Sequence, residues 1–385
     1  TTLLNAISML FVDNAMEKLS KADLEKEAIL NPEKAEKRKQ MRRRARLMAV
    51  ITVLCVFCVV CTTGFMVVRA MGKSSIMSKG GGQEPAISTD INVMDKVEQW
   101  QEGWIGYKDK IYEYNDDIMT FLIMGIDKKD RLETVENGGQ KGQADAIFLV
   151  VMNPHDKKVD LIAINRDTMA DVEVYGQSGA YSGTVKAQIA LQHAYGDGKD
   201  KSAKLMEKAV SALMYQLPIH GYLAVNMDGI PTINDTIGGV EVECIEDLTA
   251  ADPALGAGEN VRLEGETAFW YVKYRDTNVF ESNRHRLERQ AQYLQGFIEQ
   301  ARAAFRKDVT LPLTLFQKLS PYMTTDIKAD EVTYLATTAA SYEFSGEIYL
   351  LDGETKMGDV YEEFYPDEDA LHQMVIDIFY EEVQQ

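Results

Sequence analysis

Acidic side chains stand at the ends of three apolar runs that are typical of neighbouring β-strands. Asp127 ends the first run and Asp145 begins the second, whereas Arg166 and Asp167 end the third. Proteins in which strands and helices alternate place their sites where strands end. Two or three carboxylates from adjacent strands form an oxygen-rich site for a hard cation such as Mg²⁺. A single Asp after a strand is more often a turn former, so this prediction depends on the group.

Basic side chains form a second group further along the chain. Lys273 and Arg275 are two residues apart in a predicted strand over 269–276, and this spacing points both side chains to one face. Arg286 and Arg289 are three residues apart in a predicted helix and also share a face. The strand and the helix after it therefore predict a convergence of several positive charges.

Converging guanidinium groups favour phosphate or pyrophosphate as a ligand, because their paired N–H donors match phosphate oxygens in bidentate fashion. Gln290 lies beside this basic group, and Arg284 is near enough in sequence to join it. The alternative is a solvated helix whose arginines form ion pairs along its surface, for example with Glu288. Spacing alone leaves both interpretations open.

The charge of the chain excludes some classes of function. The 385 residues carry a formal net charge of −19, and the first 46 residues hold 11 Lys/Arg against 7 Asp/Glu, so the remainder is more acidic still. Such a domain has no general attraction for nucleic acid. The four cysteines and five histidines show no zinc-ligand spacing. No motif indicates a covalent nucleophile or a phosphate-binding loop.

The elements that would position these side chains alternate between strand and helix. The predicted strands cover 118–127, 144–154, 159–167, 222–227, 238–244 and 269–276. The predicted helices cover 91–117 (an entry helix or stalk), 202–217, 228–237, 286–305, parts of 310–342 and a short segment after 362. Several of the strands are apolar on both faces, which predicts an α/β sandwich with a covered central sheet.

A membrane span precedes these elements. Residues 47–68 are 22 residues without a charge, and a helix of that length extends about 33 Å, enough to cross the hydrocarbon core. Seven basic residues stand between Lys37 and Arg46, whereas only Arg69 and Lys73 closely follow the span. The positive-inside rule then predicts a cytoplasmic N-terminus and an extracytoplasmic C-terminal domain. A buried core helix and a cleaved signal peptide are the alternatives.

Six sequence blocks in order resemble the LytR-CpsA-Psr family of cell-wall glycopolymer ligases. They are FLIMGID, ADAIFLVVMNPHDKKVDLIAINRDT, HAYGDG, MDGIPTINDTIGGVEVE, LEGETAFWYVKYRD and RLERQ, and they cover about 118–305. The resemblance implies an α/β/α sandwich with a mixed central sheet and a deep apolar pocket for a polyprenyl chain. It gives the organisation as a cytoplasmic basic tail (1–46), a transmembrane helix (47–68), an extracytoplasmic linker or stalk (69–117) and a catalytic domain (118–385).

The same resemblance assigns roles to individual residues. It implies metal ligation by Asp127 and Asp145. It implies catalytic roles for Asp145, Arg166 and Asp167, with Asp145 and Asp167 as alternative proton acceptors. It implies pyrophosphate binding by Lys273, Arg275, Arg286, Arg289 and Gln290.

Three blocks depart from the family pattern. The family's Arg-Ser-Asp block reads Gln143-Ala144-Asp145 here, its Pro-Arg-Asp block begins with Asn165, and the first arginine of its strand block is Lys273. A lysine attracts phosphate as a point charge without the bidentate fork of arginine. These changes indicate a divergent subgroup.

The resemblance implies a Mg²⁺-dependent phosphotransferase that moves a glycopolymer from a polyprenyl-pyrophosphate carrier to peptidoglycan. The absence of an arginine at Gln143 leaves open a non-catalytic protein that binds polyprenyl phosphate. A transcriptional attenuator is a third interpretation, which the predicted extracytoplasmic topology and the acidic charge disfavour.

Overall fold

The computed structural model describes residues 32–80, 84–95, 99–128, 142–176 and 178–384. The chain divides into two compact units, Thr1–Ala70 and Met71–Gln385. Of the predicted tail 1–46, residues 1–31 lie outside the described residues.

One long helix, α2 (Pro32–Lys79), forms the described part of the first unit and continues into the second. Within it, Leu47–Lys79 is the candidate membrane span found among the described residues, with a mean hydropathy of 2.6. None of its most apolar stretch is buried, which distinguishes it from the core helix of a soluble domain. The predicted span 47–68 lies inside this segment, so a single N-terminal membrane anchor is indicated.

The segment after the span differs from the predicted linker and entry helix. The region contains α3 (Ile91–Met94), β1 (Trp104–Tyr107) and β2 (Lys110–Tyr114). The helix predicted over 91–117 is wrong, because residues 104–114 form the antiparallel hairpin of β1 and β2. Lys108 and Asp109 both adopt positive φ, the conformation that a two-residue hairpin turn requires.

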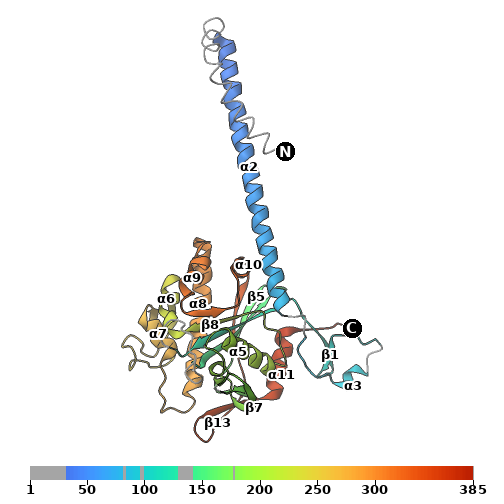
Figure 1. Cartoon of the computed structure of the whole chain (residues 1–385), viewed down its shortest axis with the longest axis vertical. Helices are drawn as coiled ribbons and strands as arrows, with labels where there is room; N and C mark the ends of the chain where they lie inside the picture. The colour runs from blue at the N-terminus through green and yellow to red at the C-terminus, as the bar shows by residue number, and fades with distance from the viewer. Residues whose placement is uncertain (1–31, 81–83, 96–98, 129–141, 177, 385) are drawn as a thin grey trace. The chain divides into compact units, whose positions relative to one another are not determined.

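A six-stranded mixed sheet forms the centre of the second unit, with the strand order β11-β8-β3-β4-β5-β12 (Figure 1). Its strands are β3 (Met119–Ile126), β4 (Ala144–Asn153), β5 (Lys158–Ala163), β8 (Tyr222–Asn226), β11 (Met323–Thr325) and β12 (Glu343–Leu350). Strand β3 is antiparallel to β4 and parallel to β8, and β5 is parallel to β12. The predicted mixed central sheet is confirmed.

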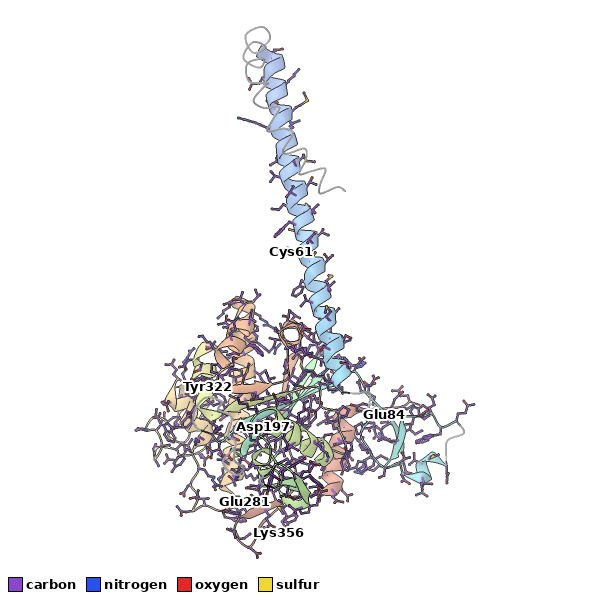
Figure 2. The ribbon with its side chains drawn as sticks, viewed as in Figure 1. Cys61, Glu84, Asp197, Glu281, Tyr322 and Lys356 are labelled. Atoms are coloured by element: carbon purple, nitrogen blue, oxygen red, sulfur yellow. The ribbon has the colours of Figure 1, made fainter. Side chains whose placement is uncertain are left out.

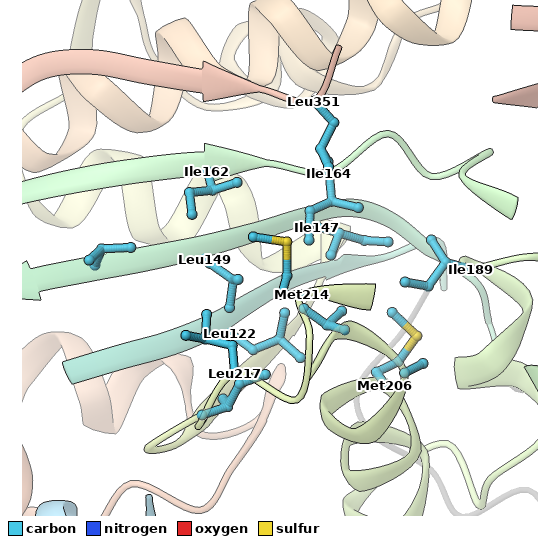
Figure 3. Packing of buried hydrophobic residues seen from close by; sticks show 14 of the residues in the cluster. Leu122, Ile147, Leu149, Ile162, Ile164, Ile189, Met206, Met214, Leu217 and Leu351 are labelled. Carbon is cyan, nitrogen blue, oxygen red and sulfur yellow. The ribbon is translucent and has the colours of Figure 1, made fainter. Parts of the chain in front are cut away.

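Helices cover both faces of this sheet. They are α5 (Asp200–Leu213) and α11 (Glu368–Phe379) on one face and α8 (Ser282–Lys307) on the other. On the first face Leu122 and Leu149 of the sheet pack with Met206 of α5 (Figure 3). On the second face Phe148 packs with Leu287 of α8. The predicted α/β/α sandwich is confirmed, and its two cores account for the strands that are apolar on both sides.

The remaining described elements complete the folded unit, and some of them also pack against the sheet. They are β6 (Met169–Tyr175), β7 (Tyr181–Gln188), α4 (Leu191–Ala194), η1 (Met227–Gly229), α6 (Ile230–Thr236), β9 (Val240–Glu243), β10 (Asn260–Leu263), α7 (Glu266–Lys273), α9 (Leu311–Leu319), α10 (Ala329–Ala339), β13 (Gly353–Met357), β14 (Glu362–Pro366) and β15 (Tyr380–Glu382). The strand predicted over 269–276 is wrong, because most of it belongs to α7. Its aromatic residues favour strands by propensity, but Ala268, Phe269, Tyr271 and Val272 are buried at helical spacing.

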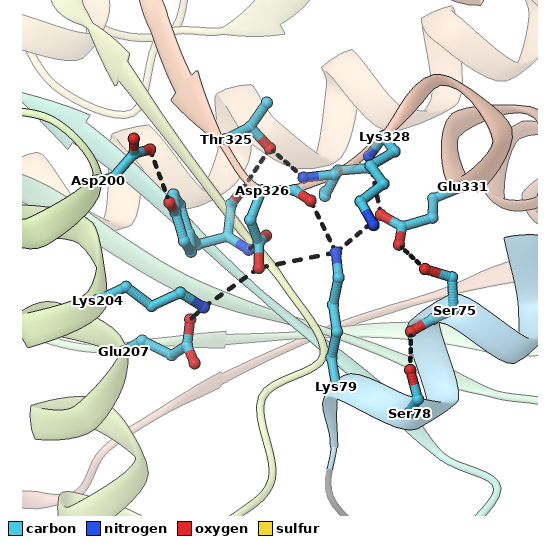
Figure 4. A network of polar contacts seen from close by, with 12 residues as sticks. Ser75, Ser78, Lys79, Asp200, Lys204, Glu207, Thr325, Asp326, Lys328 and Glu331 are labelled. Atoms are coloured by element: carbon cyan, nitrogen blue, oxygen red, sulfur yellow. Dashed lines mark hydrogen bonds and ion pairs between the residues drawn. The ribbon is translucent and has the colours of Figure 1, made fainter.

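The last turns of α2, residues 71–79, are fixed within the second unit by a buried carboxylate (Figure 4). Glu331 of α10 has no exposed surface and accepts hydrogen bonds from Ser75 Oγ at 2.6 Å and Lys79 Nζ at 2.8 Å. A Cβ at Gly72 would lie 2.5 Å from a carbonyl oxygen of α10, so the two helices are in close contact there. Residues 71–79 are therefore part of the folded unit.

Candidate functional site

A β-bulge positions Asp145 at the end of the central strand pair. The register of β3 and β4 pairs Gly125 with Ala146. The next pair joins Ile126 to Ala144, so Asp145 is an extra residue of β4. A bulge interrupts the alternation of side chains and re-aims the residue that it contains. Asp145 is buried, and its two carboxylate oxygens contact two different arginines.

The turn after β5 supplies Arg166 and Asp167. Asn165 Oδ1 accepts a hydrogen bond from the Asp167 backbone N–H at 3.0 Å, and the Asn165 carbonyl oxygen accepts one from Thr168 N at 3.0 Å. Arg166 Nη1 donates to Asp145 Oδ1. Asn165 thus stabilises this turn through hydrogen bonds, whereas a proline would stabilise it by fixing the backbone angle φ.

Gln143 stands where the family pattern has an arginine, and it contacts the same group. Its Oε1 accepts a hydrogen bond from Arg166 Nη2. Gln143 therefore orients Arg166 rather than adding a positive charge, and Arg166 is held by a carboxylate and an amide at once. This lowers the charge available for an anion by one compared with the family pattern.

Helix α8 brings Arg286 to the second oxygen of Asp145. Arg286 Nη1 donates to Asp145 Oδ2 at 3.1 Å, and Arg286 is buried. Burial lowers the pKa of Arg286 from its ordinary value, and the Asp145 carboxylate opposes that effect. Because the ordinary pKa of arginine is so high, the side chain stays charged. One carboxylate thus lies between two guanidinium groups.

Asn283, one helical turn before Arg286, links the two parts of the site. Its Oδ1 accepts hydrogen bonds from Arg275 Nη1 at 2.6 Å and Arg286 Nη2 at 3.1 Å. Its Nδ2 donates to Asp167 Oδ2. Sequence reasoning missed Asn283, although its three-residue spacing from Arg286 is the signal that identifies it.

Asp167 is buried, and its pKa is raised. Burial raises the pKa, whereas the Arg166 charge and the hydrogen bond from Asn283 act in the opposite direction. Gln188 Nε2 donates to Asp167 Oδ1 at 3.0 Å, and Arg166 Nε lies 3.5 Å from the same oxygen. A carboxylate with a raised pKa is a better proton acceptor than an ordinary one.

Lys273 and Arg275 reach the site by different routes. Because α7 ends at Lys273, the two residues do not share a strand face, and the argument from their two-residue spacing is wrong. Lys273 Nζ lies 3.2 Å from Asp127 Oδ1. Arg275 follows the helix and contacts Asn283 instead.

The structure does not bring Arg289 into the network around Asp145. Arg289 is buried and donates to the backbone carbonyls of Tyr271 and Tyr274, and its Nε lies against Glu246. These contacts satisfy carbonyl groups at the C-terminal end of α7. Arg289 therefore joins α8 to α7 and has no contact with the other predicted phosphate-binding arginines.

The alternative of a solvated helix describes Arg284 but not its neighbours. Arg284 Nε lies 3.4 Å from Glu288 Oε1, an exposed ion pair between residues four apart. By contrast, Arg286 and Arg289 are both buried. Two of these three arginines are thus removed from water, which costs free energy unless they are paired.

An apolar cavity of about 190 Å³ lies between the sheet and α8. Its lining comes from β3, β4, β8, η1, α6, α7, α8 and α9 and is hydrophobic apart from Gln290 and Tyr293. Ala146, next to Asp145 in β4, is part of that lining. Gln290, one turn beyond Arg286, donates to Val272 O at 3.0 Å. The cavity therefore adjoins the charged network, an arrangement that suits an amphiphile with an apolar chain and an anionic head group.

Asp127 and Asp145 are the residues that would hold Mg²⁺. Asp127 N donates to Gln143 O at 2.9 Å, so Asp127 lies beside the start of β4. Mg²⁺ is usually bound by one or two carboxylates together with phosphate oxygens and water. Within the described part of the chain, no three His, Cys, Asp or Glu side chains form a metal site by themselves. A cation at these two carboxylates would therefore need further oxygen ligands, such as phosphate and water.

Proteins that bind an amphiphilic phosphate are the class that this pairing of arginines and apolar cavity defines. The chain belongs to the LytR_cpsA_psr family, whose family model matches residues 77–375. The resemblance seen in the six sequence blocks is thereby confirmed, and the match extends beyond 118–305 in both directions.

Curated relatives are similar over part of their length. Polyisoprenyl-teichoic acid–peptidoglycan teichoic acid transferase TagU of Enterococcus faecalis is 26% identical over 235 residues, 60% of this chain and 68% of the relative. The Bacillus mycoides protein of that name is 29% identical over 182 residues, 47% of this chain and 52% of the relative. This chain thus spans about half the length of the second relative. The solved structure of TagT bound to LI-WTA has a TM-score of 0.52 at 18% identity and covers 68% of this chain and 89% of that chain, which shows a common fold.

Proposed function

We propose that this protein is a membrane-anchored phosphotransferase of cell-wall assembly. It takes a glycopolymer from a polyprenyl-pyrophosphate carrier and attaches it through phosphate to a hydroxyl of peptidoglycan. The observation that carries the proposal is the juxtaposition of Arg166, Arg275 and Arg286 with the apolar cavity beside Ala146. The cavity receives the start of the polyprenyl chain, and the arginines receive the pyrophosphate.

The reaction exchanges the phosphoanhydride bond of the carrier for a phosphate ester bond to the acceptor. The acceptor hydroxyl oxygen attacks the phosphorus that carries the glycan, and the bond from that phosphorus to the bridging oxygen breaks. Polyprenyl phosphate leaves with the bridging oxygen, and the hydroxyl proton passes to a carboxylate. Arg166 and Arg286 stabilise charge on the transferring and leaving oxygens, because guanidinium groups fixed before the reaction need no reorganisation.

Asp167 is our proposed proton acceptor. Both oxygens of Asp145 form ion pairs with arginines, whereas Asp167 accepts hydrogen bonds from the neutral amides of Gln188 and Asn283 and has one longer contact, 3.5 Å, with Arg166 Nε. Burial also raises the pKa of Asp167. Mg²⁺ at Asp127 and Asp145, when bound, supplies a positive charge that stabilises the pyrophosphate oxygens.

We also propose that residues 1–46 are cytoplasmic and that the folded unit is extracytoplasmic. The basic residues before the span support this orientation. We expect a membrane-impermeant thiol reagent to label a cysteine introduced at exposed Val309 and not one introduced before residue 47. The reverse labelling pattern would contradict the orientation.

The test of the activity uses the full chain in detergent with Mg²⁺, a lipid-pyrophosphate glycan and uncross-linked peptidoglycan. Mass spectrometry of the peptidoglycan detects phosphoglycan. The proposal is supported if the wild type transfers phosphoglycan, if Arg286→Ala and Asp127→Ala abolish the transfer, and if a chelator stops it. Arg284→Ala is the matched control, because this exposed arginine of the same helix forms an ion pair with Glu288 on the helix surface.

A carrier-binding protein without catalysis is the second candidate, and Gln143 favours it by removing a positive charge from the site. That protein would bind the lipid donor with the same dependence on Arg286. It would transfer nothing under conditions in which a known ligase works. Asp127→Ala would then leave glycan attachment in cells unchanged.

A further inference from the structure

We propose that two segments beside Asp167 form the binding surface for the acceptor, a glycan chain of uncharged N-acetylated hexosamines. The segments are the hairpin of β13 and β14 (353–366) and the loop before α8 (276–281), called here the acceptor surface. This inference rests on the proposed transfer function and assigns a place to its second substrate. The surface is separate from the arginine network and from the apolar cavity.

The hairpin is fixed to the chain segment that carries Asp167. Phe364 N donates to the Asp167 carbonyl oxygen at 2.9 Å, and Phe364 forms a bridge with Thr168. Gln188 Nε2, which also contacts the Asp167 carboxylate, donates to Glu362 O at 2.7 Å. Phe364 itself is buried in the main core. The acceptor surface therefore keeps a constant position relative to the proposed proton acceptor.

The loop before α8 meets the hairpin at the same place. Glu281 N donates to Glu362 Oε1 at 3.0 Å, and Asn283 of the site follows two residues later. Figure 2 shows Glu281 and Lys356 of the hairpin at the same end of the folded unit. An acceptor lying across both segments would present a hydroxyl next to Asp167.

Large apolar side chains are exposed on both segments. Their exposed fractions range from 41% to 71%, and they are Val279, Phe280, Met357, Val360, Tyr361 and Tyr365. Soluble domains seldom gather such residues on one surface unless it binds a partner. An aromatic ring with a polar edge packs against the C–H face of a pyranose ring while its hydroxyl remains in contact with water.

The charge of the hairpin selects among possible partners. Residues 353–366 include Glu354, Asp359, Glu362 and Glu363 but only one basic residue, Lys356. This acidic surface repels phosphates, so it disfavours the phosphate-bearing donor and an anionic bilayer surface alike. A glycan chain without charge binds there without that repulsion. The arginine network thus attracts the phosphate-bearing donor, whereas the acidic hairpin is left for the uncharged acceptor.

The experiment measures binding of N-acetylglucosamine oligosaccharides, which are glycan strands without charge, to the full chain in detergent by titration calorimetry. Tyr361→Ala and Phe280→Ala remove exposed rings on the two segments, and Tyr361→Phe keeps the ring. Val309→Ala is the matched control, because Val309 is 86% exposed and follows the far end of the 26-residue helix α8, about 39 Å from Glu281.

We expect at least tenfold weaker binding of the strands by the combined Tyr361→Ala and Phe280→Ala variant, and binding within twofold of wild type by Tyr361→Phe and Val309→Ala. In the transfer assay the combined variant should raise the KM for peptidoglycan while binding the lipid donor normally. Unchanged binding of the strands by the combined variant would overturn the inference. If the wild type binds the strands through these rings but transfers no phosphoglycan, the acceptor surface is supported and the proposed transferase function is wrong. Tyr361→Ser and Phe280→Ser are alternatives if the alanine variants do not fold.

Discussion

The Nη1 atom of Arg286 lies 3.1 Å from the Oδ2 atom of Asp145, and both side chains are almost fully buried. A buried ion pair contributes little net stability when it is complete, but the loss of one partner leaves an unpaired charge that costs about 3–5 kcal/mol. If the Asp145 carboxylate were removed, only another anion, such as a phosphate, would compensate for the buried positive charge of Arg286.

We predict that Arg286→Ala lowers transfer about 10²–10³-fold, the usual effect of removing one fixed donor from a reacting oxygen, and lowers the free energy of unfolding. Arg286→Lys keeps the charge and much of the stability but lacks the fork that reaches both Asp145 and Asn283. Its transfer rate should stay at least tenfold below wild type. Urea unfolding and transfer assays measure the two effects separately, and a fully active Arg286→Lys would contradict the bidentate role.

The pH dependence of transfer should report Asp167. Burial raises the pKa of this carboxyl group, and a proton acceptor must be deprotonated, so the rate falls as the pH falls through that raised pKa. Asp167→Asn should lose most activity and the acidic limb of the profile with it. If the acidic limb of the profile persists in Asp167→Asn, the titration of another group causes it.

The same shift has a consequence for stability. The folded protein binds a proton at Asp167 more readily than the unfolded chain, so this group makes the free energy of unfolding decrease as pH rises from its ordinary value of 3.8 through the raised pKa. Asp167→Asn should remove that decrease. Urea unfolding of both proteins over this pH range measures it, and identical slopes would contradict the assignment.

Filling the apolar cavity should affect lipid binding according to chain length. Leu315 lines the cavity, whereas Leu313 of the same helix is 48% exposed and is not part of the lining. Leu315→Trp should weaken binding of long-chain polyprenyl donors at least tenfold and leave a donor with a short, water-soluble chain unaffected. Leu313→Trp is the matched control. Equal effects of both substitutions on the long-chain donor would place the chain elsewhere.

The contact between the end of α2 and α10 should be important for stability. Burial alone would raise the pKa of Glu331, but hydrogen bonds from Lys79 and Ser75 bring it below its ordinary value. A lowered carboxyl pKa adds stability that is present above 4.5 and is lost as pH falls through the folded pKa. Lys79→Met should destabilise the folded unit by about 3 kcal/mol and reduce this acid dependence.

Ser78→Ala is the control for that prediction, because Ser78 is on the same turn of α2 and its Oγ donates to the Ser75 carbonyl rather than to Glu331. Thermal unfolding of the full chain between pH 4 and pH 7 compares the two variants. A Lys79→Met protein as stable as Ser78→Ala would mean that Glu331 is satisfied by Ser75 and the backbone alone.

Much of the fold follows from local pattern. The strands next to Asp127, Asp145 and Asp167 are apolar over most of their length, and these acidic residues stand where the strands end, so both the strands and the candidate site residues at their ends can be predicted. The amphipathic helix over 286–305 is equally clear, since its apolar residues recur at helical spacing. These predictions needed no knowledge of long-range contacts.

The site was harder to predict where function depends on packing. Arg286 and Arg289 have the same residue type and lie on one helix face, yet the first contacts a carboxylate and the second contacts backbone carbonyls. Asn283 contributes no charge, so a search for charged groups passes over it. The strand predicted at 269–276 failed because aromatic residues suit a buried helix as well as a strand.

The three-stranded sheet of β1, β2 and β15 has a consequence for the order of folding. Strand β15 pairs with β2 near Asn115 and Glu381, which are 266 residues apart, and Figure 1 shows the C-terminus close to β1. At a synthesis rate of about 5–20 residues per second, β2 waits roughly 13–53 seconds for its partner strand. Until then its edge is open to pairing with another chain. The sheet of β1, β2 and β15 is therefore completed only when nearly the whole chain is present.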